Sequence, residues 1–450
     1  MSIHFFRVVP YKYITICIKR HLVLVAFLVL STLPLEGSRP WTLYGAFQAD
    51  GFLKESAYKA LIDLEHTIKK VSDGSLWAVV DLFEGSSYSR YSLHRSGKQL
   101  VETGIVDSLV GTMKKGLTLA FKGRAGSRTM VIYSGHGSGC LEPKNERVGD
   151  VSGKQADTYS AVLAYQQRQY RFFADKVHGT AKKDVAYEVP SKVQCKALFI
   201  QNPTGEVPTP SLCACLAWIR REYLEGKKID IVGFDACQMA MIELANELSP
   251  SVRYMIASQE REYKNGWDYK ALIKSLHEEK GARSLVRRVV YEYGSKQRAC
   301  AGISYSLSAL HLSRIAQVVT HLERVALYSC ESLQSSQGVH EGICEARLRL
   351  RQRSLHERYV DLCSYCEELL IELSLLPATS STRSLQQALH DLLCVTQQAI
   401  EASVSSYDRA TLKGCSVYFP LHYTPVIYTC SLASLSGWFS FLHTFNGLKL

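Results

Sequence analysis

The chain has 450 residues, of which 46% are hydrophobic and only 12 are proline. This composition excludes an intrinsically disordered protein and predicts a core large enough for one extended α/β domain, or for one domain with an appendage. The net charge of +11 is spread along the chain without interleaved aromatic residues, which argues against a nucleic-acid-binding surface.

The N-terminal segment has the parts of a secretory signal. Basic residues precede the apolar run 22–33, and small residues follow it. The run is too short to cross a bilayer comfortably. We therefore predict an exported protein (periplasmic, envelope-associated or secreted) with residues 1–37 as a signal peptide. A retained membrane anchor is the alternative, and in either case membrane contact is confined to this segment.

The next part of the chain alternates strand-like and helical patterns. Near-continuous apolar runs are typical of parallel strands that are covered on both faces, and the alternation favours right-handed crossovers. We predict a three-layer α/β/α sandwich with a mainly parallel sheet. The expected strands lie at 41–47, 76–82, 129–133, 229–235 and 254–257, with 90–94 as an edge strand, and the expected helices at 52–71, 108–121, 212–224 and 238–248.

Two further regions depart from this alternation. Between about 140 and 212 the pattern loosens into a long surface excursion with one or two short elements, among them 196–200. Residues 312–404 are mostly helical, and 415–420 predict a late strand. We therefore divide the chain into the segment 1–37, an α/β domain over 38–311, and a mostly helical C-terminal region over 312–450 that packs on the core.

His136 and Cys237 each follow a buried strand in a glycine-containing turn. Glycines flank the histidine, so the backbone can turn sharply there and approach a ligand closely. The expected helix 238–248 would place the thiol at a helix start, where free amides and the helix dipole stabilise a thiolate. An imidazole can act as base and acid, so the pair predicts a cysteine-histidine hydrolase, with the amides of Gly137 and Cys237 as oxyanion donors.

Less specific interpretations of these residues remain open. A cysteine at a strand end is commonly a small buried hydrophobe. Asp235, two residues earlier, has the position of a helix N-cap. The polar loop from Ser258 to Trp267 follows the strand 254–257 and would line a cleft beside Cys237 if the strands are parallel. The close pairs Cys213/Cys215 and Cys363/Cys366 favour buried thiols over a metal site, so we expect no metal and no cofactor, while a calcium requirement is left open.

The two blocks together resemble the signatures of the clostripain-like (C11) cysteine peptidases, which share the caspase and gingipain fold. His136 lies within Tyr133–Gly139, and Cys237 lies within Ile231–Ala240. The similarity extends from Trp41 through Ser258 and Gly266–Tyr269 to Ser416–Pro420, so it covers most of the mature chain.

The resemblance implies a His136/Cys237 dyad that cleaves protein or peptide substrates after Arg or Lys. It implies that Asp235 belongs to the P1 pocket, where a carboxylate is the natural partner of a basic side chain. Ser258 and Trp267 are expected to contribute to substrate binding. It also implies activation by a cut at a basic residue between the two blocks, with these candidates: Lys144, Arg147, Lys154, Lys182 and Lys183.

Three positions depart from the pattern of these peptidases. Gly135 stands where relatives tend to carry Asp or Asn, Gln238 replaces an apolar residue, and Gln259 replaces an acidic residue. Two other functions therefore remain as alternatives: a catalytically inactive caspase-like binding or envelope protein, and a thiol amidase that acts on cell-wall peptides.

Overall fold

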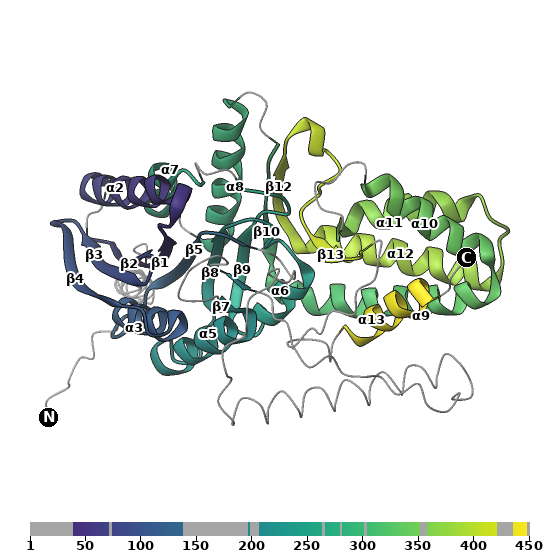
Figure 1. Ribbon diagram of the computed structural model, residues 1–450, viewed down its shortest axis with the longest axis horizontal. Helices are drawn as coiled ribbons and strands as arrows, with labels where there is room; N and C mark the ends of the chain where they lie inside the picture. The colour runs from purple at the N-terminus through teal and green to yellow at the C-terminus, as the bar shows by residue number, and fades with distance from the viewer. Residues whose placement is uncertain are drawn as a thin grey trace, which may run out of the picture. The chain divides into compact units, whose positions relative to one another are not determined.

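In the part of the chain that the structure describes, nine strands form one central sheet (Figure 1). The computed structural model describes residues 39–71, 74–137, 197–198, 207–262, 266–279, 281–300, 304–351, 358–420 and 435–447. The order across the sheet is β12 (Ile400–Ser405), β10 (Ser306–His311), β9 (Val252–Ala257), β8 (Ile229–Asp235), β5 (Arg128–Ser134), β1 (Trp41–Gln48), β2 (Leu76–Glu84), β3 (Ser87–His94) and β4 (Gly97–Ile105).

The five central strands, β9, β8, β5, β1 and β2, run parallel, and the outer strands on both sides pair antiparallel. Every residue of β1 is buried, as expected for a strand that is covered on both faces. The predicted mixed α/β sandwich with a mainly parallel sheet is confirmed. The carboxyl ends of the parallel strands meet at one edge, which is where open α/β sheets bind ligands.

Helices cover both faces of the sheet (Figure 1). One apolar cluster joins the sheet to α2 (Lys54–Val71), α7 (Tyr269–Glu278) and α8 (Ala282–Arg298). A second cluster, on the other face, includes side chains of α3 (Leu109–Phe121), α5 (Thr209–Tyr223) and α6 (Ile242–Leu248).

The C-terminal helices extend the second cluster beyond the β12 edge of the sheet (Figure 1). They are α9 (Ile315–Ser335), α10 (Gln337–Arg351), α11 (Leu362–Ser374), α12 (Ser380–Ala399) and α13 (Ser436–Gly447). The late strand predicted at 415–420 is β13 (Ser416–Tyr418), which pairs with β11 (Tyr359–Asp361). Short elements complete the described chain: β6 (Ala197–Leu198), β7 (Val207–Pro208) and the 3-10 helices Gly51–Leu53, Leu312–Arg314 and Tyr407–Arg409.

Three element predictions are wrong. The helix expected from 238 begins only at Ile242, because the amides of residues 238 and 240 bond to the segment after β9. The strand at 90–94 is not an edge, since β4 pairs along its outer side. Residues 400–404 form β12 rather than the end of a helix, because the edge of β10 offers them a partner.

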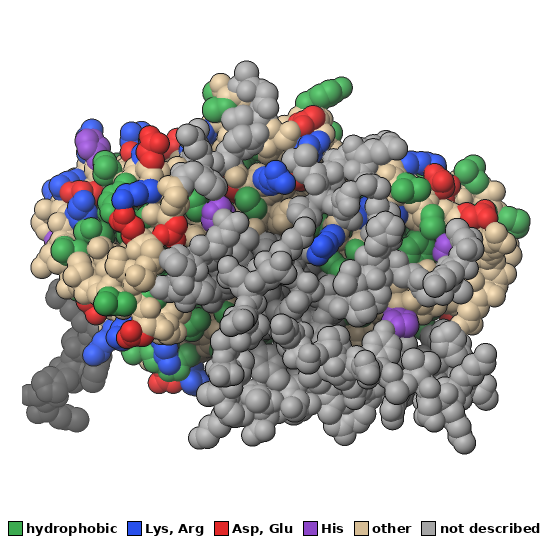
Figure 2. All heavy atoms as spheres, in the orientation of Figure 1, with side chains coloured by type: hydrophobic (Ala, Val, Ile, Leu, Met, Phe, Trp, Pro, Cys, Tyr) green, Lys and Arg blue, Asp and Glu red, His purple; other side chains and the backbone are tan. Residues whose placement is uncertain are grey.

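The expected signal segment 1–37 and most of the expected excursion 140–212 lie outside the described residues. The end of the excursion is described, and α5 already begins there at Thr209. Within the described ranges, no helix combines the length and the apolar composition that a membrane crossing needs. On the face shown in Figure 2, Lys and Arg side chains lie among Asp and Glu side chains over the α2 end of the sheet.

Candidate active site

The register of two neighbouring strands brings the histidine block beside the cysteine block. Strands β5 and β8 are parallel, and Ser134 pairs with Asp235 at their carboxyl ends. His136 and Cys237 each lie two residues beyond this pair. The Gly135 amide donates to the Asp235 carbonyl at 3.1 Å, so the two chains stay together as they leave the sheet.

Gly137 packs directly against the cysteine turn. A Cβ atom on Gly137 would lie 2.4 Å from the Cys237 carbonyl oxygen and 3.1 Å from the Ala236 Cβ. Real Cβ atoms do not approach backbone oxygen this closely, so only glycine permits this contact. Close packing against the cysteine turn therefore explains the glycine at position 137, in addition to the sharp turn that glycine allows.

Gln48, at the end of β1, supports the histidine turn from its other side. Its Oε1 accepts a hydrogen bond from the His136 amide at 3.0 Å, and Gln48 is almost fully buried. Burial lowers the pKa of His136, and the charge of Asp50 opposes this shift. The imidazole is therefore neutral at neutral pH and can accept a proton.

The Cys237 thiol contacts the backbone of the segment after β9. The Glu262 amide lies 3.2 Å from Sγ, and Sγ lies 3.9 Å from the Glu262 carbonyl oxygen. Burial raises the pKa of Cys237, and the Glu262 amide partly offsets this shift. Because α6 begins five residues after Cys237, the expected stabilisation of a thiolate by a helix start is wrong. The thiol is neutral at rest and needs a base to become a nucleophile.

Asp235 is a buried carboxylate with several donors. Its Oδ2 accepts hydrogen bonds from Tyr269 Oη at 2.8 Å, Ser134 Oγ at 3.2 Å and the Trp267 amide at 3.4 Å. Burial raises the pKa of Asp235, although these donors favour its charged form. The N-cap interpretation is wrong, because Met241 occupies the N-cap of α6.

Ser258 and Trp267 lie behind this site and not on an open surface. Ser258 is fully buried and contacts Ser306 Oγ at 3.0 Å. Trp267 is 3% exposed and its ring packs on Gly233, where a Cβ atom would lie 2.6 Å from the indole. The structure therefore brings the turn of His136 and Gly137 against the turn of Cys237, at the end of the strand that carries Asp235, and places Ser258 and Trp267 in the supporting layer.

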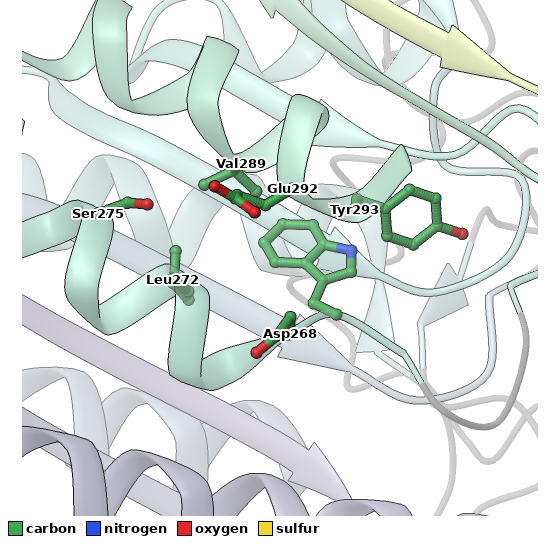
Figure 3. Close-up of a pocket in the computed structure, with 7 residues that line it drawn as sticks. Asp268, Leu272, Ser275, Val289, Glu292 and Tyr293 are labelled. Atoms are coloured by element: carbon green, nitrogen blue, oxygen red, sulfur yellow. The ribbon is translucent and has the colours of Figure 1, made fainter. Parts of the chain in front are cut away.

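A small cavity lies between α7 and α8, and Trp267 contributes to its lining (Figure 3). Asp268, Leu272 and Tyr293 are among its lining residues. Its volume of about 10 Å³ holds no more than one water molecule. This cavity is a packing defect under the site and not a substrate cleft. Nowhere in the described ranges do three or more His, Cys, Asp or Glu side chains cluster so as to hold a metal ion.

Sequence reasoning missed two contributors, Gln48 and Glu262. Gln48 could have been found, since a polar residue that ends an apolar strand in a parallel sheet lies at the ligand-binding edge. Glu262 acts through its backbone amide, so its side-chain type carries no signal.

Comparison with known proteins identifies the family. Residues 178–420, more than half of the chain and including Cys237, match the Clostripain family C11. The chain belongs to the clostripain family. It is therefore a C11 cysteine peptidase, as the resemblance of its two sequence blocks suggested. No curated protein matches the chain.

Solved structures of other C11 peptidases are similar to this clostripain-family chain in fold. A secreted C11 cysteine protease from Bacteroides thetaiotaomicron, in complex with an irreversible peptide inhibitor, is 15% identical with a TM-score of 0.55, covering 91% of this chain and 100% of that chain. "Iotapain", a secreted C11 protease from the same organism, is 12% identical with a TM-score of 0.53, covering 90% and 99%. An inactive zymogen C11 protease from Parabacteroides distasonis is 12% identical with a TM-score of 0.52, covering 92% and 100%. At these identities the likeness concerns the fold.

Proposed function

We propose that this C11 peptidase is an exported endopeptidase that cleaves after Arg or Lys, with Cys237 as the nucleophile and His136 as the base. The observation that carries the proposal is the register of β5 and β8, which places both residues two positions beyond the Ser134–Asp235 pair. The neutral imidazole takes the thiol proton as Sγ attacks the scissile carbonyl, and returns it to the leaving amine.

The amides of Gly137 and Cys237 are the proposed oxyanion donors. Gly137 supports this role by its contact with the cysteine turn, which keeps the two backbone segments together. Preformed backbone donors stabilise a developing oxyanion without reorganisation, which is the main requirement of acyl transfer.

Asp235 is the proposed partner of the basic P1 side chain. The three donors described above all use Oδ2, so in the described part of the chain Oδ1 is the oxygen available to a guanidinium or ammonium group. A buried carboxylate attracts a cation more strongly than an exposed one because water screens it less. Trp267 enters the proposal as a residue whose amide holds this carboxylate in place. Ser258 enters it as a support of the cysteine turn, since its carbonyl accepts from the Ala240 amide.

Export and activation complete the proposal. The basic and apolar N-terminal segment supports export, and two of the similar solved proteins are described as secreted. Activation would be a cut at one of the five basic candidates between the two blocks. Mass spectrometry of the wild type beside Cys237→Ala identifies the mature N-termini, and an internal cut that is absent from the variant is autocatalytic.

The decisive experiment compares Cys237→Ala with Cys215→Ala on peptide reporters that end in Arg, Lys or norleucine. We expect Cys237→Ala to lower kcat by at least about a thousandfold, because the nucleophile is lost. Cys215 is a buried thiol on α5 outside the site, so its variant should retain activity.

A basic acyloxymethyl ketone gives an independent readout of the same assignment. It should label Cys237 in the wild type, and its norleucine analogue should label it poorly. Persistent hydrolysis by Cys237→Ala would contradict the nucleophile assignment. Cys237 that resists both reagents would favour the inactive binding protein, and cleavage of cell-wall peptides without a basic P1 preference would favour the amidase.

A further inference from the structure

The segment that carries Cys237 is held by the segment that follows β9. The Gln238 amide donates to the Glu260 carbonyl at 3.0 Å, and the Ala240 amide donates to the Ser258 carbonyl at 2.9 Å. Gln238 has a φ of 60°, a left-handed conformation that these contacts maintain. The Glu262 amide on Sγ belongs to the same segment. The placement of residues 258–262 therefore sets the surroundings of the thiol.

Gln259 is the side chain that anchors this segment from behind. It is 4% exposed, and its amide makes three hydrogen bonds. Nε2 donates to Asp361 Oδ2 at 2.9 Å and to Ser416 Oγ at 2.8 Å, while Oε1 accepts from the Gly414 amide at 2.8 Å. The Gln259 side chain thus joins the segment 258–262, which contacts the cysteine turn, to two segments that lie more than 100 residues later in the chain.

The partners of Gln259 are themselves held in place. Asp361 Oδ1 caps α11 through the Ser364 amide at 2.8 Å, and its Oδ2 also accepts from the Lys413 amide at 2.7 Å. The Ser416 amide donates back to the Ala240 carbonyl at 2.9 Å. These contacts close a ring of hydrogen bonds from the cysteine turn through Gln259 to the C-terminal region and back.

We propose that Gln259 is a positioning residue of the active site, which couples the Asp361 and Gly414–Ser416 segments to the placement of the Glu262 amide on Cys237. The inference rests on the proposed role of Cys237 as the nucleophile. Gln259 does not touch substrate; it acts by fixing the backbone that contacts Sγ and that lies against the cysteine turn. The C-terminal region is, through this residue, a part of the catalytic apparatus.

The nearly isosteric substitution Gln259→Glu tests this role, because the protonation state of the new carboxyl group decides whether the anchor to Asp361 forms. Gln259→Glu would place a second carboxyl group against Oδ2 of Asp361. Burial already raises the pKa of Asp361. The pair can share one proton at low pH, and a hydrogen bond then replaces the amide contact. As the pH rises, two adjacent carboxylates repel each other and the anchor is lost.

The neighbouring titratable groups are shared by Gln259→Glu and the wild type, so the ratio of the two enzymes compares the effect of the substitution alone. Burial raises the pKa of Cys363, Cys366 and Cys415, so these thiols stay neutral. The Lys413 side chain pairs with Glu367, and Glu243 accepts from the Tyr418 amide at 2.8 Å.

The experiment compares Gln259→Met and Gln259→Glu with Tyr44→Phe as a matched control. Tyr44→Phe removes one buried hydrogen bond of 2.8 Å to Asp81, remote from the cysteine turn. For Gln259→Met we expect kcat to fall by about tenfold to a hundredfold with KM within about twofold of the wild type, the result of a misplaced catalytic group. Tyr44→Phe should lower thermal stability without changing kcat.

The pH profile separates positioning from simple destabilisation. For Gln259→Glu, kcat relative to the wild type should be near one at acidic pH and fall as the pH rises. This variant keeps the proposal testable even where Gln259→Met does not fold. A ratio that is independent of pH, or a Gln259→Met enzyme with wild-type kcat, would overturn the inference.

Alkylation of Cys237 by iodoacetamide needs no peptide substrate, so it distinguishes this inference from the proposed function. If the wild-type protein cleaves no reporter with a basic P1 residue, the proposed function is contradicted. The alkylation rate of Gln259→Glu relative to the wild type should still fall with rising pH, since the Glu262 amide no longer stabilises the thiolate. An unchanged ratio removes the role of Gln259.

Discussion

The carboxylate of Asp235 organises the turn at 266–269 as well as serving the proposed P1 site. A Cβ atom on Gly266 would lie 2.5 Å from Oδ2, so the turn passes directly over the carboxylate. Lys296 Nζ donates to the Gly266 and Trp267 carbonyls at 2.9 and 3.0 Å, which holds a positive charge near the Asp235 carboxylate. A basic P1 group would supply the countercharge that burial makes favourable.

Asp235→Asn tests this role. We expect kcat/KM on Arg and Lys reporters to fall by about a hundredfold, because the amide loses the charge that a P1 cation recognises. Hydrolysis of the norleucine reporter should change little, since asparagine can still accept from Tyr269. Asp230→Asn is the matched control on the same strand, remote from the cysteine turn. An equal loss on all reporters would show that Asp235 serves the fold of the site and not its specificity.

The central strands of the sheet were predictable, whereas the start of α6 and the edge strand β12 were not. The apolar residues Met239, Ile242, Ala245 and Leu248 have helical spacing, yet the helix begins only at Ile242. Tertiary partners of the amides at 238 and 240 override the local pattern. Ile400 likewise continues the spacing of α12 but leaves the helix to pair with β10. Such competition with distant segments is not visible in local periodicity.

The docking of α13 offers a test at this scale. Glu323 on α9 accepts hydrogen bonds from the Gly437 and Trp438 amides at 2.8 and 3.0 Å, and burial raises the pKa of Glu323 from 4.5 to about 7. The folded state therefore binds a proton that the unfolded state releases. Stability from this group is complete below pH 4.5 and is lost as the pH rises toward 7.

Glu323→Gln should remove this dependence, because the amide mimics the protonated acid. The free energy of unfolding of the wild type, measured in denaturant and taken relative to Glu323→Gln, should decrease by about 3 kcal/mol between pH 4.5 and 8. The difference between the two proteins cancels the contributions that the other titrating groups make to the pH dependence of stability. A difference that stays constant or increases with pH would show that Glu323 is ionised in the folded protein.

On the scale of the whole molecule, the sheet was predictable because strand and helix patterns alternate up to Ala257. The proximity of the His136 and Cys237 turns followed from the same reasoning, since parallel strands end at a common edge. The ring through Gln259 could not be predicted, because Asp361 and Ser416 lie 102 and 157 residues away in the chain. The packing of the C-terminal helices around Trp438 and Phe441 likewise depends on contacts across α9 and α13.

The sheet also predicts how a cut chain behaves. A cut between 141 and 206 would separate β5 from β8, yet these strands pair over five consecutive positions from Met130–Ile231 to Ser134–Asp235. Both apolar clusters also span the boundary. Limited trypsin digestion of Cys237→Ala should therefore yield two fragments that co-elute in size-exclusion chromatography and separate only in denaturant. Fragments that separate in native buffer would contradict this.

The bridge between Met241 and Ser416 limits how far this enzyme can be shortened from its carboxyl end. A version that stops after β10 would keep the five parallel strands, His136 and Cys237, and therefore both proposed reacting side chains. It would nevertheless lack the strand that flanks the cysteine turn and all three partners of the Gln259 amide. The smallest unit that holds the complete proposed catalytic centre therefore reaches at least Phe419, whose amide still pairs with the Arg358 carbonyl.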